Sequence, residues 1–193
     1  MKGNQTIIAE YAEKVHTDEA FYRSNFELNA SMAEFIATDI LCYKNQTDWS
    51  YMSDMVKDRP FLIFRFSESG CKPCNFDLLT QIQTTLSDYS SFVRMFHSVN
   101  TERELLMFKN TYNIILPLYL IPSKPFDWIA EKENVPFFFV LHPNMKISHV
   151  YVPNKDFPEQ NKLYLESVIR FLEQKRVLLI DDSFDTYLTA TSV

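Results

Sequence analysis

The chain has 193 residues, of which 46% are hydrophobic and 15% are aromatic, a composition typical of a globular protein and unlike a disordered one. Its formal net charge of −6 argues against a nucleic-acid partner, because binding phosphates requires a basic surface. Gly3 and Gly70 are its only glycines, which excludes Gly-rich phosphate loops. No stretch of the sequence approaches the ~18 apolar residues of a membrane span, and the N-terminus lacks the apolar core of a signal peptide. We therefore expect a soluble chain without membrane contact.

Residues 1–57 are predicted to form a helical extension that packs on the rest of the chain. Thr17 and Asp18 form a typical helix start. Cys42 falls within this predicted helix, where a free buried cysteine behaves as a small hydrophobe. Pro60 disfavours helix at the residue before it and marks the start of a domain expected to span 58–176. The apolar residues that recur at helical spacing are Leu28, Met32, Phe35, Ile36, Ile40 and Tyr43.

From residue 61 onward the pattern alternates between strands and helices, which implies parallel pairing. The last two strands are joined by a four-residue link, with Asn144 as the candidate for positive φ, and predict an antiparallel hairpin. We therefore expect a mixed sheet with helices on both faces. The tail, 177–193, is expected to add an edge strand or to pack on the N-terminal helices. Strands are predicted at 61–66, 92–97, 114–120, 137–141 and 147–152; helices are predicted at 73–89, 101–111 and 159–174, with a helical turn over 127–133.

The sequence places two cysteines in a C-x-x-C motif, Cys71 and Cys74, directly after an apolar run. A thiolate at a helix N-terminus is stabilised by unpaired N–H groups and by the macrodipole. Lys72 adds a nearby cation, and Pro73 suits the first helical positions. We therefore predict a reactive dithiol in which Cys71 attacks a disulfide and Cys74 resolves the mixed disulfide.

Three features resemble the thioredoxin superfamily: the GCKPC motif at 70–74, the Val135-Pro136 pair ahead of the strand 137–141, and the hairpin-plus-helix ending. The long stretch between the first two features, which holds IILPLYL, is similar to the TlpA/ResA-like group of bacterial cell-envelope thioredoxins. The resemblance implies a thioredoxin-like three-layer α/β/α fold with a mixed central sheet.

The same resemblance implies an activity, thiol–disulfide exchange with protein substrates. An upstream redox partner would exchange electrons with the dithiol, without a bound cofactor or metal. It also implies a cis peptide before Pro136, with the backbone of Val135 pairing with the substrate main chain. The bacterial cell envelope or periplasm is the expected location, and the cytoplasm is the alternative.

The site departs from the family pattern at two positions. Gly70 stands where thioredoxins usually carry Trp, which removes an aromatic wall beside the dithiol. Arg65 stands six residues before Cys71, where many thioredoxins bury an Asp that relays protons to the resolving thiol. Glu68, Glu133 or a water molecule is expected to replace that relay.

Three other functions stay open. Structural zinc would need a second ligand pair, and Cys42 with the four histidines forms neither C-x-x-C nor H-x₃-H. A thiol peroxidase resembling peroxiredoxins would carry Pro and Thr where this chain has Phe64 and Glu68. A thioredoxin-fold binding or scaffold module with little or no redox turnover is the alternative from outside the enzymes.

Overall fold

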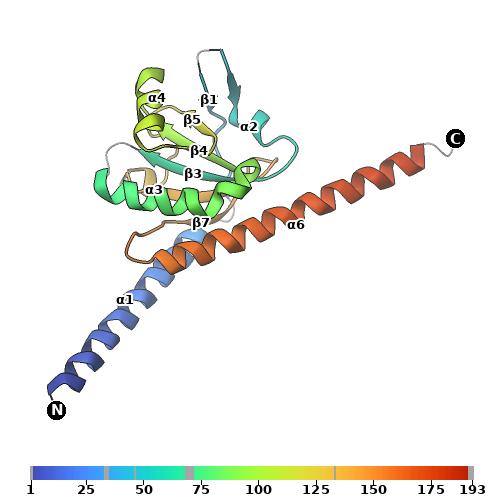
Figure 1. Ribbon diagram of the computed structural model, residues 1–193. Coiled ribbons are helices and arrows are strands. Elements are labelled where there is room, and N and C mark those ends of the chain that lie inside the picture. Colours follow the sequence, from blue (N-terminus) through green and yellow to red (C-terminus); the bar gives the residue numbers. More distant parts are fainter. Residues whose placement is uncertain (1, 33–34, 46, 68–71, 133, 191–193) are drawn as a thin grey trace.

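The computed structural model describes residues 2–32, 35–45, 47–67, 72–132 and 134–190, and builds them around one mixed sheet (Figure 1). The strand order is β2-β1-β5-β4-β3-β6-β7. The strands are β1 (Leu41–Tyr43), β2 (Trp49–Tyr51), β3 (Phe61–Ser67), β4 (Val93–Ser98), β5 (Leu118–Leu120), β6 (Phe137–Leu141) and β7 (Ile147–Tyr151). The helices are α1 (Lys2–Met32), α2 (Met52–Met55), α3 (Lys72–Leu86), the 3-10 helix η1 (Ser87–Phe92), α4 (Glu102–Thr111), α5 (Ile129–Lys132) and α6 (Pro158–Ala190).

The two strands with long apolar runs, β3 and β6, are neighbours in the sheet. Strand β3 pairs parallel with β4 and antiparallel with β6, and every residue of β6 is buried. Strands buried on both faces need apolar side chains in both directions, which explains the unbroken FLIF and FFFVL runs. The expected mixed α/β sheet is confirmed.

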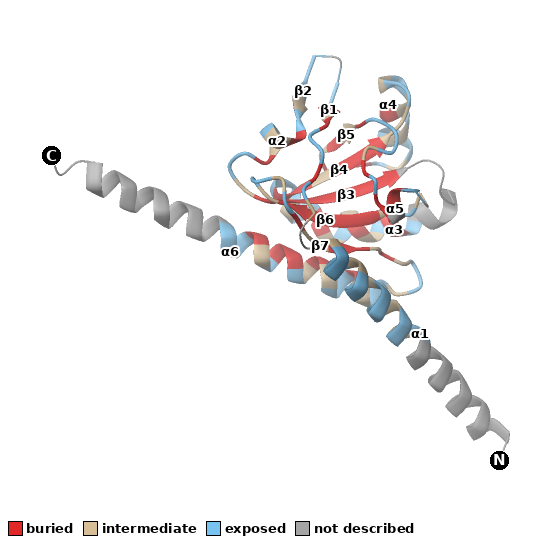
Figure 2. Ribbon diagram, turned by 180° about the vertical axis from the view of Figure 1, so that it is seen from behind, coloured by how far each residue is buried: buried red, intermediate tan, exposed pale blue. Residues whose placement is uncertain are grey.

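Alternate residues of β3 belong to two separate hydrophobic clusters, one on each face of the sheet. The strand itself is buried along most of its length (Figure 2). On one face Leu62 and Phe64 pack with apolar residues of α3, α4 and α6. On the other face Ile63 packs with residues of α2 and α5 and with the C-terminal part of α1. This period-two division of one strand produces the three layers.

Residues 41–51 do not continue a helix, and the expectation of helix through residue 57 is wrong here. They form the β1–β2 hairpin, closed by the side chain of Asn45, whose Oδ1 accepts hydrogen bonds from the backbone N–H groups of Thr47 and Asp48. Strand β1 has a buried residue, Cys42, between two more exposed ones, which is the alternation of a strand. Cys42 and Phe61 belong to one cluster, so the core crosses the expected boundary at 57/58.

Both terminal helices are longer than expected. Helix α1 begins at Lys2, well before Thr17, and α6 runs on to Ala190, so the expected edge strand at 177–193 does not form across its described part. After Pro158 the sequence of α6 holds neither Gly nor Pro, the residues that most strongly interrupt helices. Figure 1 shows both helices extending past the sheet. Across the described residues, no helix combines the length and the apolar character needed to cross a bilayer.

The β6–β7 hairpin forms as expected, with a different residue in the left-handed region. Met145 has φ 62, and Asn144 is not among the residues with positive φ. The Asn144 side chain instead accepts a hydrogen bond from the N–H of Lys146, a local turn contact available to Asn. The expectation for Asn144 is therefore wrong by one residue.

Candidate active site

The dithiol segment connects the central strand to a helix N-terminus. Strand β3 ends at Ser67 and α3 begins at Lys72, so Pro73 and Cys74 lie in the first helical turn. The predicted helix start is therefore confirmed. Glu68, Gly70 and Cys71 lie outside the described residues, as do the side chains of Lys72, Pro73 and Cys74.

The Val135-Pro136 pair lies beside the end of β3, the strand that precedes the dithiol in the sequence. Strand β6 begins at Phe137, which pairs with Arg65 near the end of β3, so the two preceding residues run beside the end of β3. The structure thus places Val135 and Pro136 beside the end of β3, a strand about 70 residues earlier in the chain.

The peptide between Val135 and Pro136 is trans, because the described residues include no cis peptide bond, and the cis form expected from the resemblance is wrong. Trans is the ordinary form, favoured by about 0.5–1 kcal/mol even before proline. The N–H of Val135 donates to the carbonyl of Ala130 at 2.9 Å, which closes the turn after α5. The side chain of Val135 is 37% exposed.

A buried ion pair joins the end of β3 to α5. Nε of Arg65 lies 3.0 Å from Oε2 of Glu131, and Nη2 lies 2.5 Å from Oε1. Both side chains are only 2% exposed. Burial lowers the pKa of Arg65, and the hydrogen bond and charge of Glu131 oppose that shift. The two-point geometry holds the guanidinium in one orientation.

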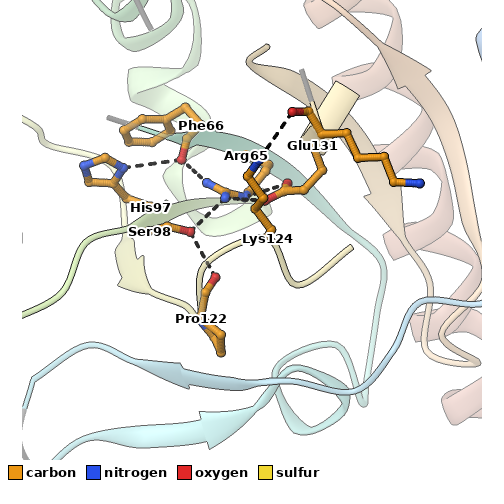
Figure 3. Close-up of polar contacts among 8 residues, drawn as sticks. Arg65, Phe66, His97, Ser98, Pro122, Lys124 and Glu131 are labelled. Carbon is orange, nitrogen blue, oxygen red and sulfur yellow. Dashed lines mark hydrogen bonds and ion pairs between the residues drawn. The ribbon is translucent and has the colours of Figure 1, made fainter. Parts of the chain in front are cut away.

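The same guanidinium also links the ends of neighbouring strands (Figure 3). Nη1 of Arg65 donates to the carbonyl of Phe66, and Nη2 donates to Oγ of Ser98 at 2.7 Å. The Ser98 hydroxyl donates in turn to the carbonyl of Pro122 at 3.0 Å. Arg65 therefore ties β3, β4, α5 and the segment after β5 into one network.

His97 lies on the opposite face of the sheet from this ion pair. Its ring stacks on Phe66 at 4.4 Å and contacts Phe108 at 4.3 Å, and Nδ1 donates to the Phe66 carbonyl at 3.3 Å. Burial lowers the pKa of His97 to about 4. The hydrogen bond to Phe66 opposes this shift, and the positive charge of Arg65 adds to it. The imidazole is therefore neutral at pH 7.

A cleft of about 380 Å³ opens where β3, β4 and β5 end. Crevices beyond the carboxyl ends of parallel strands are the usual ligand sites of α/β sheets. Arg65 and Ser98 line it together with polar groups that include Lys124 and Asn134. The cleft thus places hydrogen-bonding groups close to the end of the strand that leads to the dithiol.

Sequence reasoning missed Glu131. The sequence shows Arg65 as a departure from the family pattern and points to Glu68, Glu133 or water as the replacement proton relay; both of these glutamates lie outside the described residues. An arginine between apolar neighbours in a buried strand needs a buried counter-ion. Helix α5, which contains Glu131, comes just before the Val135-Pro136 pair. A buried arginine together with an acidic residue close to Val135-Pro136 was the sequence pattern that could have predicted the role of Glu131.

The other cysteine and two of the histidines lie away from this site. Cys42 is fully buried, and burial raises the pKa of its thiol to about 12; the expectation of a buried free thiol is confirmed. His142 and His149 are half-buried, and each places a ring nitrogen 2.7 Å from Oγ of Ser148. The described residues contain no cluster of three or more potential metal ligands.

No protein-family model matches the sequence, and no curated protein matches it. Solved structures do resemble it. A thiol:disulfide interchange protein from Bacteroides sp. is 14% identical with a TM-score of 0.53, over 73% of this chain and 90% of that chain. The thioredoxin domain of a thiol-disulfide oxidoreductase from Bacteroides vulgatus is 12% identical with a TM-score of 0.52, over 72% and 97%.

The same comparison finds peroxidoxin BcpB from Mycobacterium tuberculosis, 12% identical with a TM-score of 0.50, over 71% of this chain and 97% of that chain. Similarity at these identities concerns the fold, which redox proteins of more than one kind share. The expectation drawn from the GCKPC motif and the hairpin-plus-helix ending is confirmed at this level. The chain has a thioredoxin-like fold.

Proposed function

We propose that the protein is a thiol–disulfide oxidoreductase acting on protein disulfides through Cys71 and Cys74. One observation carries the proposal: the C-x-x-C motif leads from the central strand β3 into the N-terminus of α3, within a thioredoxin-like fold. Backbone N–H groups and the macrodipole at that position favour a thiolate.

The exchange proceeds in two displacements. The Cys71 thiolate attacks one sulfur of a substrate disulfide, forms a mixed disulfide and releases the other substrate sulfur as a thiolate. The Cys74 thiolate then attacks the Cys71 sulfur and releases the second substrate thiolate. The protein finishes as the Cys71–Cys74 disulfide, the substrate has gained two electrons, and an upstream dithiol partner restores the reduced form.

Residues around the dithiol tune its reactivity. Lys72 supplies a cation beside the thiolate, and Pro73 fixes the backbone at the start of α3. Gly70 supplies no aromatic side chain beside Cys71, and Glu68, Glu133 or a water molecule exchanges protons with the resolving thiol. Glu131 does not take that role in this proposal, because both of its oxygens are bonded to Arg65.

The substrate chain docks across the segment that precedes β6. Val135 offers an exposed apolar contact beside the end of β3, and Pro136 fixes the path of the backbone into the sheet. The N–H of Val135 is already bonded to Ala130, so its carbonyl pairs with the substrate main chain and its side chain supplies an apolar contact. We further propose the TlpA/ResA-like group of the bacterial cell envelope, on the GCKPC motif and the additional strand β5.

A thiol peroxidase is the less favoured enzyme. Seven residues before Cys71, where peroxiredoxins carry Pro, the chain has Phe64, which stacks on Phe66 and Phe138 in the core. That position therefore belongs to the hydrophobic cluster. The fold shared with peroxidoxin BcpB does not distinguish peroxide reduction from disulfide exchange.

Substrate trapping tests the proposal. A Cys74→Ser variant should accumulate mixed disulfides with cellular proteins, because the resolving thiol is gone, and a Cys71→Ser variant should not. Cys42→Ser is the matched control and should behave like the wild type. Wild-type protein should also reduce insulin disulfides with dithiothreitol as the electron source. If neither trapping nor insulin turnover exceeds that of the Cys71→Ser variant, the scaffold alternative replaces the oxidoreductase.

A further inference from the structure

A second cleft, of about 530 Å³, lies at the end of the sheet where β3 begins, whereas the dithiol follows the other end of β3 in the sequence. Arg59, which lies two residues before the first residue of β3, lines this cleft. A seven-residue strand spans roughly 23 Å, so the two sites are separate. The other lining residues are Lys44, Ser90, Ser91, Arg94, Leu105, Leu106, Lys109, Ile115, Leu116, Pro117, Leu118 and Tyr119.

The charged side chains of this cleft are all basic. Arg59, Arg94, Lys109 and Lys44 line it, and the lining includes neither Asp nor Glu, although acidic residues outnumber basic ones 25 to 19 in the chain. Lys44 lies 3.3 Å from Asp48. Within the described residues, no ion pair involves any of the other three. The cleft therefore concentrates positive charge without an internal counter-ion.

The two guanidinium groups are held in place by the protein. Arg59 and Arg94 lie 5.0 and 4.2 Å from the centre of the Phe61 ring, the range of cation–π contacts. Arg59 also donates to the carbonyl of Ser91 at 2.9 Å, and Arg94 donates to the carbonyl of Val93 at 2.8 Å. These contacts fix the cations before any ligand arrives, which lowers the entropic cost of binding one.

The positive charges also act on each other. Burial lowers the pKa of Arg94, the interaction with Tyr119 opposes that shift, and the charge of Arg59 adds to it. A bound anion would offset that repulsion and accept charge-assisted hydrogen bonds from the free N–H groups. The protein thus holds two like charges in a geometry that an anion would stabilise.

One wall of the same cleft is apolar. Leu106 and Ile115 line it and are 50% and 60% exposed, which leaves apolar surface in contact with water beside the cations. A ligand that is only an anion would leave this wall uncovered. We propose that the cleft binds a small organic dianion, a phosphate monoester or a dicarboxylate, whose apolar portion packs on Leu106 and Ile115.

Isothermal titration calorimetry at fixed ionic strength and pH 7.5 tests the site with phenyl phosphate, which is mostly a dianion at that pH. Wild-type protein should bind phenyl phosphate, and should bind inorganic phosphate at least several-fold more weakly because it lacks the ring. Phenylmalonate tests a dicarboxylate in the same way. Whichever of the two aromatic dianions binds with the higher affinity identifies whether the site prefers a phosphate or a carboxylate ligand.

The Arg94→Gln variant should bind phenyl phosphate about tenfold more weakly, because it loses one charge-assisted hydrogen bond. Lys109→Gln should weaken the binding of phenyl phosphate less. Lys124→Gln is the matched control, because it removes a cation from the other cleft and should change nothing. Arg94→Lys keeps the charge and should retain part of the affinity, and circular dichroism verifies that each variant is folded.

Three results would overturn the proposal. The first is the absence of binding of either aromatic dianion by wild-type protein at 10 mM, a concentration at which even about −3 kcal/mol of binding would be seen. The second is equal weakening by Lys124→Gln and Arg94→Gln, which would indicate a general effect of charge. The third is equal affinity for phenyl phosphate and inorganic phosphate, which would exclude the apolar wall from the site.

Discussion

Replacing Glu131 with glutamine would leave the guanidinium of Arg65 buried without its counter-ion. Both side chains are 2% exposed, so water cannot take over the lost charge. Removing one partner of a buried pair costs about 3–5 kcal/mol. The amide oxygen of glutamine can still accept one of the two hydrogen bonds from Arg65. We therefore expect the free energy of unfolding to fall by about 3 kcal/mol, at the lower limit of that range.

Urea denaturation followed by circular dichroism measures this loss. With a slope of about 2 kcal/mol per molar urea, the Glu131→Gln midpoint should fall by roughly 1.5 M. The double variant Arg65→Met with Glu131→Leu removes both charges and should recover most of the stability, since apolar replacements of buried pairs are often neutral or better. Glu19→Gln is the control, because its partner Arg23 is exposed and such pairs contribute only about 0–1 kcal/mol.

A loss below about 1 kcal/mol in Glu131→Gln would refute this reasoning, because a pair worth that little is typical of solvent-exposed charges. A double variant no more stable than the Glu131→Gln single variant would also contradict it. That result would show that the two side chains do not act as a pair.

Three further predictions concern other parts of the fold. The pKa of His97 in the folded protein, about 4, lies below the ordinary value of 6.5. Its neutral form therefore contributes stability that is fully present above pH 6.5 and is lost as the pH falls toward 4. In urea titrations across pH 4–7, His97→Leu should remove roughly 3 kcal/mol of this loss of stability in acid. Asn25 accepts a hydrogen bond from the N–H of Val152 at 2.7 Å, so Asn25→Ala should destabilise the α1–β7 contact by about 1–2 kcal/mol and speed amide exchange at Val152, whereas the exposed Arg23→Ala should not. Lys124 has φ 48, so Lys124→Gly should raise stability by up to about 1 kcal/mol in thermal denaturation, and an unchanged or lower midpoint would contradict strain at that residue.

Local patterns were sufficient to predict the part of the fold that carries the dithiol. The apolar runs at 61–66 and 137–141 indicated buried central strands, and α3 begins where the C-x-x-C motif and Pro73 placed a helix start. These signals act within a few residues of the chain, so they do not depend on knowing the tertiary contacts. The α4 helix was likewise predicted within one residue, because Thr101 caps it through a capping box with Glu104.

Contacts between residues far apart in the chain could not be predicted from these local patterns. Glu131 meets Arg65 across 66 positions, and sequence order alone does not select it from the neighbouring acidic residues. A helix was predicted where β1 lies because Ile40 and Tyr43 fit helical spacing. The three residues of β1 are instead stabilised by pairing with β2 and β5. In each case a tertiary contact decided the structure.

The rate at which each cysteine reacts with iodoacetamide at neutral pH tests the central claim most directly. Peptide mass spectrometry of the reduced protein resolves the three sites, and Cys42 is an internal reference because burial raises the pKa of its thiol to about 12. Cys71 should be alkylated far faster than Cys74 or Cys42, as a thiolate stabilised at the start of α3 requires. Equally slow labelling of all three cysteines would contradict the assignment of Cys71 as the nucleophile.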